Sequence, residues 1–584
     1  MNWRTMLFLL TIAILACAGC GEGDNGGGSG TGGVFAAAGP LTLQAESENE
    51  IVFHVSYGDV QLKNVEIHGR NFVAATIDGF DSWGDTGQPS LPALRRAVLL
   101  PFGAKAAVTV DPKMVERIRV AGPIAPTQPS VPKLPGALDR APFAMDESLY
   151  AADAFVVGRF ADIVDEEMVR NHRLALLEIT PVDYNPAKNE LLVARDLTVT
   201  IHLSDADLAQ TTALAERFGN PIFDEIVIAY IANTGAHWAI FDAPKKGADY
   251  LIIYADDLAG TALDELAALK TRDGWTVHTE DVEAIGATVA EISAYIKLQY
   301  NLLPNLTFVL LVGAVDTIPY IVGTQLDNPP TDLYYSVLNT GSYLPSLLLG
   351  RLPAITTAHL SNMVAKIAAY ESDGGAWRKN AAFLASQDDY VISEGSHNFV
   401  IANYLDPNHY TSAKLYCHTY NATPAQVTAA VNAGQNYTVF SGHGDVTDWA
   451  DGPAYYQSDV EALTNTEYPF VASFACLTGD YAQDECFSET WLRVAHGASG
   501  MLASSVYSYW TEDDWYERGM FGAAFAAVAA NPSTQVMPDQ VWAASMALAG
   551  KMFVWTKSNH TGNAHRYFEQ YNLFGDPSMV LWTR

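Results

Sequence analysis

YTVFSGHG at residues 437–444 and PFVASFACLTG at residues 469–479 are apolar runs of strand length that end on chemically capable side chains, His443 and Cys476. In a parallel α/β sheet, reactive side chains collect in the crevice beyond the carboxyl ends of the strands. Two such strands lying close together would bring an imidazole and a thiol to one rim. A cysteine hydrolase needs these two groups, with His as general base and acid and Cys as nucleophile.

The residues around His443 and Cys476 strengthen this interpretation. Gly442 and Gly444 bracket the histidine, and glycine permits close backbone approach and unusual dihedral angles. A turn through Thr478 and Gly479 follows the cysteine instead of a continued strand. The alternatives are plain: the chain has 14 His, and a lone buried Cys usually behaves as a small hydrophobic residue.

The two runs belong to a longer stretch, residues 248–584, in which strand and helix patterns alternate. This cadence predicts a parallel or mostly parallel sheet with helices on both faces. The other predicted strands are YLIIYA, WTVHTE, FVLLVG, LLLGRLP, AAFLAS, SAKLYCH and GMLASSV. Helices are predicted near 263–271, 289–298, 359–370, 396–405, 424–433 and 459–463, with two apolar helices ending near 552.

The first half of the chain has a different pattern. Residues 41–240 contain many short segments with period-two alternation, such as IVFHVSY and LLVARDLTVTIHL, separated by turn residues. We therefore expect an all-β, sandwich-like domain, with a Pro-rich loop around residues 126–135. An exposed linker at 241–247, which contains Lys245 and Lys246, would join it to the α/β domain.

The N-terminus is typical of an exported protein. Residues 1–20 read as a signal peptide with an apolar stretch too short to span a bilayer, and residues 21–40 as a flexible Gly-rich tether. CAGC at 17–20 resembles a bacterial lipobox, which would make Cys20 the lipidated first residue of a membrane-anchored lipoprotein at the cell envelope. An ordinary cleaved signal peptide is the alternative.

Composition limits the remaining possibilities. The formal net charge of −33 argues against nucleic acid as a partner, because the phosphate backbone would be repelled. Beyond the signal region only Cys417, Cys476 and Cys486 remain, too few for a disulfide framework. The sequence has no CxxC, HExxH or phosphate-loop motif, so we expect no metal or nucleotide in catalysis.

With Gly-His-Gly at one strand end and Ala-Cys at another, residues 248–584 resemble the gingipains, caspase-like cysteine peptidases of family C25. The resemblance extends to VLLVGAVDTIP, SGHGDVTDW, ECFSETWLR and LFGDPSMVLW, and to the separation of 33 residues (476 − 443) between His and Cys. GDTGQPSLPALRRAVLLPFGA, in the β-rich half, resembles the N-terminal pro-domain of these enzymes. That domain is then expected to act as the chain's own inhibitor or chaperone.

The resemblance implies catalytic roles for particular residues. His443 would be the general base and Cys476 the nucleophile, and the backbone N–H groups of Gly444 and Cys476 would form the oxyanion hole. A carboxylate that orients the histidine falls on Asp388, where the family pattern has Glu. The alternative for Asp388 is a solvated loop acid.

The resemblance also predicts how substrate is selected. Glu394 falls where arginine-directed members place an acid at the base of the S1 pocket, and Trp510 where a tryptophan walls that pocket. Glu394 would then select Arg or Lys at P1, although an acid near a helix start is the alternative. Asp513 and Asp514 are candidates for a structural Ca²⁺, or are merely solvated.

Together these patterns predict an exported cysteine endopeptidase that acts on proteins or peptides. Lys245 and Lys246 would be its processing site. Two other functions stay open: a sortase-like transpeptidase, in which an amine resolves the acyl-enzyme, and an inert surface adhesion or scaffold lipoprotein. Cys486 and Cys417 are expected in the core, Cys417 within its strand, and His496 beside a helix C-cap glycine.

Overall fold

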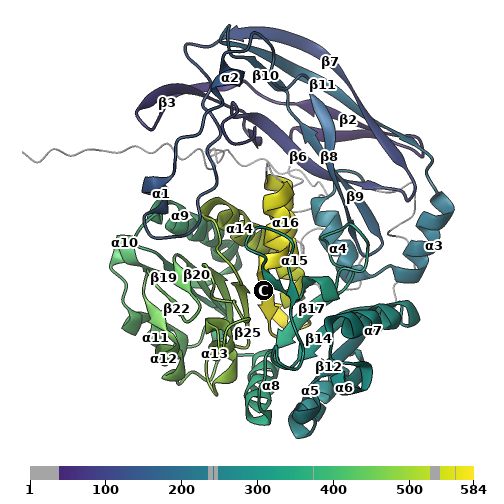
Figure 1. Ribbon diagram of the computed structural model, residues 1–584, viewed down its shortest axis with the longest axis vertical. Coiled ribbons are helices and arrows are strands. Elements are labelled where there is room, and N and C mark those ends of the chain that lie inside the picture. Colours follow the sequence, from purple (N-terminus) through teal and green to yellow (C-terminus); the bar gives the residue numbers. More distant parts are fainter. Residues whose placement is uncertain are drawn as a thin grey trace, which may run out of the picture.

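The computed structural model describes residues 39–583 except 235–240, 242–246, 373, 527–539 and 559–560. Cys20, Lys245 and Lys246 lie outside the described residues, as does most of the predicted tether. The β-rich half and the α/β half are each layered, and they pack against one another through a shared hydrophobic cluster (Figure 1). Among the described residues, no helix is both long and apolar enough to cross a bilayer.

The N-terminal half contains two main antiparallel sheets whose inner faces share one hydrophobic core. The 15-residue strands of the first sheet, β7 and β11, pair along their length, and β7 alternates exposed and half-buried residues, as expected when one face meets solvent. The first sheet comprises β1 (Leu41–Glu46), β2 (Glu50–Ser56), β7 (Lys105–Arg119), β10 (Val182–Asn185) and β11 (Glu190–Ser204). The second comprises β5 (Asp81–Trp83), β6 (Leu91–Leu100), β8 (Ala161–Val169) and β9 (His172–Ile179).

Two helices end this half, which the strand pattern did not predict. α3 (Leu208–Phe218) begins at Asp207 and α4 (Pro221–Tyr230) at Asn220, and both capping side chains accept backbone N–H groups of the first turn. α4 packs on α15 of the other half. The Tyr230 hydroxyl donates to the Ala549 carbonyl oxygen at 2.5 Å, so the C-terminal part of this half is tied to the α/β domain.

The α/β half is built on one ten-stranded sheet whose two parallel halves run in opposite directions. β27 is parallel to β17 and antiparallel to β25, and it therefore joins the two halves. The mostly parallel sheet predicted from sequence is confirmed. The order is β13 (Thr276–Asp281), β12 (Asp249–Tyr254), β14 (Leu306–Val312), β17 (Leu348–Leu352), β27 (Tyr571–Phe574), β25 (Gly500–Ser504), β24 (Phe470–Phe474), β20 (Tyr437–Ser441), β18 (Asn380–Ala385) and β19 (Thr411–Tyr416).

Helices alternate with the strands of this sheet along the chain, as predicted. The longer ones are α5 (Thr261–Arg272), α7 (Val289–Leu302), α8 (Thr357–Ser372), α9 (Tyr390–Val400), α11 (Pro424–Asn432), α14 (Trp510–Ala526), α15 (Ala543–Lys557) and α16 (Thr561–Gln570). α9 starts six residues before the predicted 396, and a π-helical turn continues it to Leu405. The short α12 (Gln457–Glu461) and α13 (Phe487–Arg493) lie beside the second half-sheet.

Three minor predictions are settled by these boundaries. Cys486 is buried directly before α13, as expected for a core residue. Cys417 is not within a strand: it is half-buried and follows β19 directly, because the chain turns into a short helix there. His496 lies beyond the last residue of α13, so Gly497 is not the immediate cap of that helix. The buried Lys366 ammonium donates to the carbonyl oxygens of Trp491 and Leu492 in the last turn.

Candidate active site

The candidate catalytic side chains follow three neighbouring strands. β18, β20 and β24 pair in parallel, and their last residues, Ala385, Ser441 and Phe474, lie in one row across the sheet. Asp388, His443 and Cys476 follow within two or three residues of that row. The shared register brings the three side chains to one rim because parallel strands end at the same edge.

His443 is held between two partners. Its Nε2 lies 2.8 Å from Asp388 Oδ2, and its Nδ1 lies 2.8 Å from the backbone carbonyl oxygen of Lys133. The ring also meets Trp510 edge-on, with 5.6 Å between ring centroids. Nδ1 therefore faces the backbone of Lys133, and Nε2 is the nitrogen that the Asp388 carboxylate orients.

Lys133 comes from the Pro-rich loop of the N-terminal half and crosses the rim as an added strand. Its N–H donates to the Ser508 carbonyl oxygen at 2.8 Å, and Trp510 N–H donates to the Val131 carbonyl oxygen at 3.3 Å. Pro132 and Tyr509 are antiparallel bridge partners. Residues 131–133 thus pair with the 508–510 edge as peptide ligands do in strand addition.

The Lys133 side chain fills a closed pocket. Its ammonium nitrogen lies 2.9 Å from Asp513 Oδ2, and it donates to Ser441 Oγ at 3.0 Å and to the Phe474 carbonyl oxygen at 2.8 Å. The nitrogen is 4.7 Å from the centre of the Trp510 ring, within cation–π range. The side chains of Lys133 and Asp513 are 0% and 1% exposed.

Asp513 is fixed in the first turn of α14. Oδ1 accepts the hydroxyls of Tyr567 at 2.9 Å and Tyr571 at 2.6 Å, and Oδ2 accepts Ser508 Oγ at 2.8 Å. Hydrogen bonds to both oxygens offset the cost of burying a carboxylate. Asp513 therefore places a preformed negative charge at the bottom of a pocket that accepts one cation.

The Lys133 carbonyl group is turned toward the catalytic side chains. Its oxygen accepts from His443 Nδ1 and lies 3.3 Å from Cys476 Sγ. Leu134 N–H donates back to the Pro132 carbonyl oxygen at 2.8 Å, a three-residue turn centred on Lys133. The loop thus presents a lysine in the pocket and its own carbonyl to the rim, but in a tightly turned backbone instead of an extended one.

The surroundings shift the pKa values of the Cys476 thiol and the His443 imidazole. Burial raises the pKa of the Cys476 thiol to about 11. Burial also disfavours the His443 imidazolium, but the hydrogen bond and charge of Asp388 outweigh it and raise the pKa of His443 above its ordinary value. For Asp388, burial opposes ionisation, yet His443 lowers its pKa, while burial and Asp388 raise the pKa of the neighbouring Asp451.

Gly444 packs directly on the backbone of the nucleophile candidate. A Cβ placed there would lie 2.8 Å from the Cys476 carbonyl oxygen and 2.9 Å from the Ala475 Cβ. Only glycine permits this approach. The Gly444 and Cys476 backbones are therefore neighbours at the rim, in the place where the sequence predicts an oxyanion hole.

Glu394 contacts Thr419 and not the lysine in the pocket. Its carboxylate accepts the Thr419 N–H at 3.0 Å and the Thr419 hydroxyl, and the acid that pairs with the lysine in the pocket is Asp513. The prediction counted back from His397 and put Glu394 ahead of a helix, but α9 begins at Tyr390, so Glu394 is inside the helix. Trp510, by contrast, lies against Lys133.

Asp513 and Asp514 are both buried, and each has protein partners. Asp514 Oδ1 accepts Ser396 Oγ at 2.5 Å and Arg518 Nε at 2.7 Å, away from the groups that surround Asp513. These contacts do not test the predicted calcium ion at this pair, which stays a prediction.

Sequence reasoning missed Lys133, Ser441 and Asp451. One signal was present: Lys133 is the only basic residue between Val120 and Arg140, and prolines stand at 132 and 135. A lone cation in a stiff Pro-rich loop is poised to enter a site with little loss of backbone freedom. Nothing in the sequence connected that loop to a pocket in the other half.

Both halves of the chain match family models of known proteins. The model of peptidase family C25 matches residues 243–582, and the C25 propeptide model matches residues 40–232. Lys-gingipain HG66 of Porphyromonas gingivalis is 28% identical over 569 residues, covering 90% of this chain and 32% of the relative. Gingipain R2 of the same species is 25% identical over 446 residues, covering 73% of this chain and 59% of the relative.

Solved structures share the fold. The crystal structure of the Arg-specific cysteine proteinase gingipain R superposes with a TM-score of 0.51 at 21% identity, covering 58% of this chain and 80% of that one. The complex of P. gingivalis gingipain pro- and mature domains gives 0.50 at 20% identity, with 57% and 80% coverage. The chain spans about a third of the length of the Lys-gingipain relatives it matches.

Proposed function

The chain belongs to peptidase family C25, and from this membership and the geometry of the rim we propose that it is the latent form of a cysteine endopeptidase that cleaves after lysine. One observation carries the proposal: Lys133 of the N-terminal half fills a closed anionic pocket while its carbonyl oxygen meets both His443 and Cys476. A substrate lysine at P1 would occupy the same pocket.

Cys476 would be the nucleophile in this reaction. Its thiolate attacks the carbonyl carbon of the P1 lysine, and the backbone N–H groups of Gly444 and Cys476 stabilise the oxyanion as it forms. His443 first takes the thiol proton at Nδ1 and then gives it to the leaving amine, while Asp388 holds Nε2. Water next attacks the thioester and releases the carboxylic acid product.

The pocket favours lysine over arginine at P1. An ammonium has three donors, and three acceptors surround it here: the Asp513 carboxylate, the Ser441 hydroxyl and the Phe474 carbonyl. The guanidinium of arginine is planar and longer, with a fork of five donors that this set does not match. Glu394, the acid predicted from sequence, would have no part in this selection.

The N-terminal half would act as the inhibitor of its own peptidase domain. The Lys133 carbonyl accepts from His443 Nδ1, so it occupies the nitrogen that must act as base. The turn from Pro132 to Leu134 holds the following peptide bond away from an extended substrate conformation. Cleavage after Lys245 or Lys246, which suits a lysine-directed enzyme, would separate the two halves and permit release.

The same proposal includes the predicted location. We infer an exported protein, anchored through a lipid on Cys20 and held off the membrane by the 21–40 tether. Cysteines of exported proteins usually pair as disulfides. A role as nucleophile would explain why Cys476 is free. Metabolic labelling with a palmitate analogue, in the wild type and in Cys20→Ala, tests this part alone: an equally labelled variant contradicts lipidation at Cys20.

A P1-varied peptide panel tests the proposed activity. The full chain, the processed chain and Cys476→Ala would be assayed on peptides differing only in Lys, Arg or an uncharged residue at P1. We expect activity only after processing, only with Cys476 and highest with Lys. Activity retained by Cys476→Ala rejects the cysteine mechanism, and mass spectrometry with an added amine distinguishes hydrolysis from transpeptidation.

A further inference from the structure

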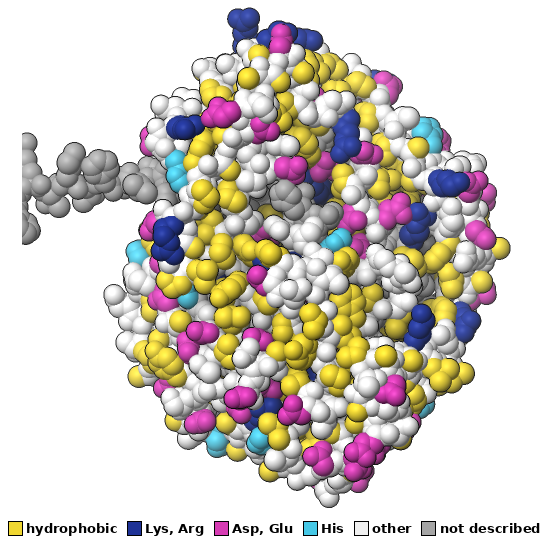
Figure 2. All heavy atoms as spheres, viewed as in Figure 1, with side chains coloured by type: hydrophobic (Ala, Val, Ile, Leu, Met, Phe, Trp, Pro, Cys, Tyr) yellow, Lys and Arg dark blue, Asp and Glu magenta, His cyan; other side chains and the backbone are white. Residues whose placement is uncertain are grey.

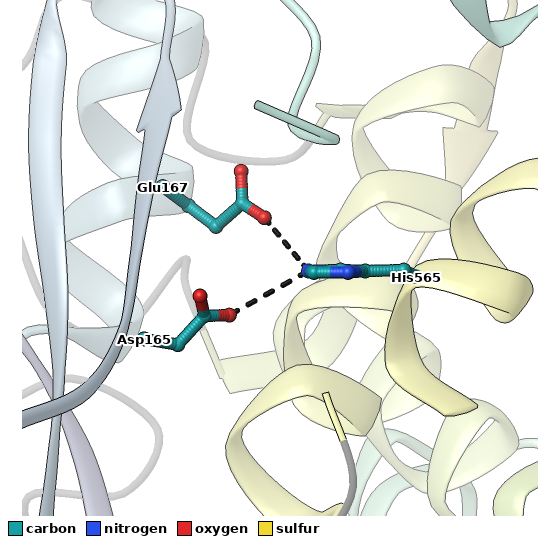
Figure 3. A group of neighbouring side chains, drawn as sticks. All are labelled: Asp165, Glu167 and His565. Carbon is teal, nitrogen blue, oxygen red and sulfur yellow. Dashed lines mark ion pairs between the residues drawn. The ribbon is translucent and has the colours of Figure 1, made fainter. Parts of the chain in front are cut away.

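A second group of chemically capable side chains lies at the contact between the two halves of the chain. Asp165 and Glu167 of β8 face His565 of α16 (Figure 3). His565 Nε2 is 2.9 Å from Glu167 Oε1 and 3.5 Å from Asp165 Oδ2. The three ligand-type atoms all lie within 4.8 Å of one another.

The imidazole points between the two carboxylates instead of at either one. Figure 3 shows the ring edge-on, with one carboxylate oxygen on each side of its plane. Nε2 is buried and has no hydrogen bond of acceptable geometry, although two acceptors are near it. A ring nitrogen directed at a point shared by two carboxylate oxygens has the donor types and the convergence of a metal ligand set.

Each of these side chains is held in place by a further partner. Glu167 Oε2 accepts Ser342 Oγ at 2.6 Å and Tyr343 N–H at 2.8 Å, which leaves Oε1 for the shared point. Trp555 Nε1 donates to Asp165 Oδ2 at 2.8 Å, and the Tyr343 ring stacks on His565 with 3.8 Å between centroids. Outer contacts of this kind orient ligands and are typical of metal sites.

The local backbone also aims the two acids. Residues two apart on a strand share a face, and the register of β8 against β9 shifts between Ile163 and Asp165. Such a bulge re-aims the side chains beside it. Glu167 is 1% exposed, so two carboxylates are directed into one mostly buried place, and among the described residues both form ion pairs with His565.

From this geometry we propose that Asp165, Glu167 and His565 form an inter-domain site for a divalent cation of the zinc class. One imidazole nitrogen and two carboxylate oxygens, with water as a fourth ligand, suit Zn²⁺. Ca²⁺ and Mg²⁺ take six or more oxygen ligands, which this set does not offer. Ligand atoms of a tetrahedral zinc site are about 3.3 Å apart, between the two nitrogen–oxygen distances observed.

The position of the site gives it a role in latency, and this part rests on the proposed function. A cation here would join β8 of the inhibitory half to α16 of the peptidase half. α16 also carries Tyr567, whose hydroxyl donates to Asp513 in the lysine pocket. Bound zinc would therefore clamp the two halves together next to the pocket that Lys133 fills.

Zinc binding can be measured without peptidase activity. The full-length Cys476→Ala chain, free of metal and of any histidine tag, would be titrated with Zn²⁺ by calorimetry and with Co²⁺ by visible absorption. We expect one site per chain and a Co²⁺ d–d spectrum, with affinity lowered about tenfold to 100-fold in His565→Gln and Glu167→Gln. Circular dichroism would verify that each variant folds.

Two control variants separate this site from other histidine–acid pairs. His278→Gln removes an imidazole that meets a single carboxylate, Asp249. His443→Gln removes the imidazole of Asp388, His443 and Asp451, the second group with ligand spacing in the part of the chain that the structure describes. Both should bind Zn²⁺ as the parent does. Absence of binding at micromolar Zn²⁺, or binding lost in His443→Gln and kept in His565→Gln, overturns the proposal.

The clamp is tested by hydrogen exchange in the same inactive chain. Zn²⁺ should slow exchange of the backbone amides of β8 in the parent and leave it unchanged in His565→Gln. Zinc bound through His565 without added protection of β8 would overturn the clamp. Because neither measurement uses turnover, a failure here is distinct from a failure of the proposed peptidase activity.

Discussion

The Lys133 ammonium and the Asp513 carboxylate, 2.9 Å apart and both buried, form an ion pair between the two halves of the chain. A buried pair is costly to break from one side, because the remaining charge is left without compensation. The pair therefore links occupancy of the pocket to attachment of the N-terminal half. This buried pair differs from the charged side chains on the surface, which are interspersed over the face shown in Figure 2.

Lys133→Ala should release latency in the full chain. Removing one partner of a buried ion pair costs about 3–5 kcal/mol, which would weaken occupation of the pocket about 100-fold or more. We expect a lysine-based acyloxymethyl ketone to label Cys476 in the variant and not in the wild type. Lys105→Ala, which removes an exposed pair with Asp205, is the control and should stay unlabelled. A Lys133→Ala chain as resistant as the wild type contradicts the role of this residue.

Asp513→Asn should lower kcat/KM of the processed enzyme for P1-lysine peptides by about 100-fold or more, because a buried ammonium would lose its counter-charge. Glu394→Gln is the informative comparison, since Glu394 bonds Thr419 and not the pocket lysine. Its kcat/KM should stay near that of the wild type. The opposite ranking of the two variants would restore the pocket expected from sequence and reject the one described here.

Asp388→Asn should lower both the rate and the pKa of His443. The carboxylate accepts from Nε2 and raises that pKa, so in the latent Cys476→Ala chain the histidine should titrate above about 6.5 by NMR, and lower in the variant. A raised histidine pKa contributes stability that is fully present below pH 6.5 or so and is lost as pH rises through the folded-state value. Loss of an orienting carboxylate should cost about 100-fold in kcat.

The pKa of the Cys476 thiol predicts slow alkylation of the latent chain. At pH 8 a thiol of pKa about 11 is ionised roughly 100-fold less than one near 9, and the thiolate is the reactive form. Iodoacetamide should modify Cys476 of the full chain slowly, with a rate that rises about tenfold per pH unit below 11 or so. Peptide mapping would follow it. Reaction at pH 8 as fast as that of a free thiol contradicts the buried, protonated state.

The sequence predicted the strands and the rim because these depend on local periodicity and on the rule that parallel strands end at one edge. It did not predict the reversal between the half-sheets, which is made by β27 pairing with two strands distant in the sequence. Lys133 and its pairing with Asp513 were missed for the same reason: neither residue has a local pattern that identifies the other. The sequence put Glu394 ahead of a helix instead of inside α9, because the residue at which a helix begins is the least certain feature of a sequence pattern.

Gly444→Ala tests whether the two strand ends must touch. A Cβ at Gly444 would lie 2.8 Å from the Cys476 carbonyl oxygen and 2.9 Å from Ala475 Cβ, so the backbone beside the nucleophile would have to move. Displacing reacting groups by even about 1 Å can cost on the order of 100-fold in rate. Gly395→Ala is the matched control, because α9 leaves open space around it and alanine is the better helix former. It should keep full activity and raise the melting temperature, whereas an active, stable Gly444→Ala would show that the rim tolerates separation of these strand ends.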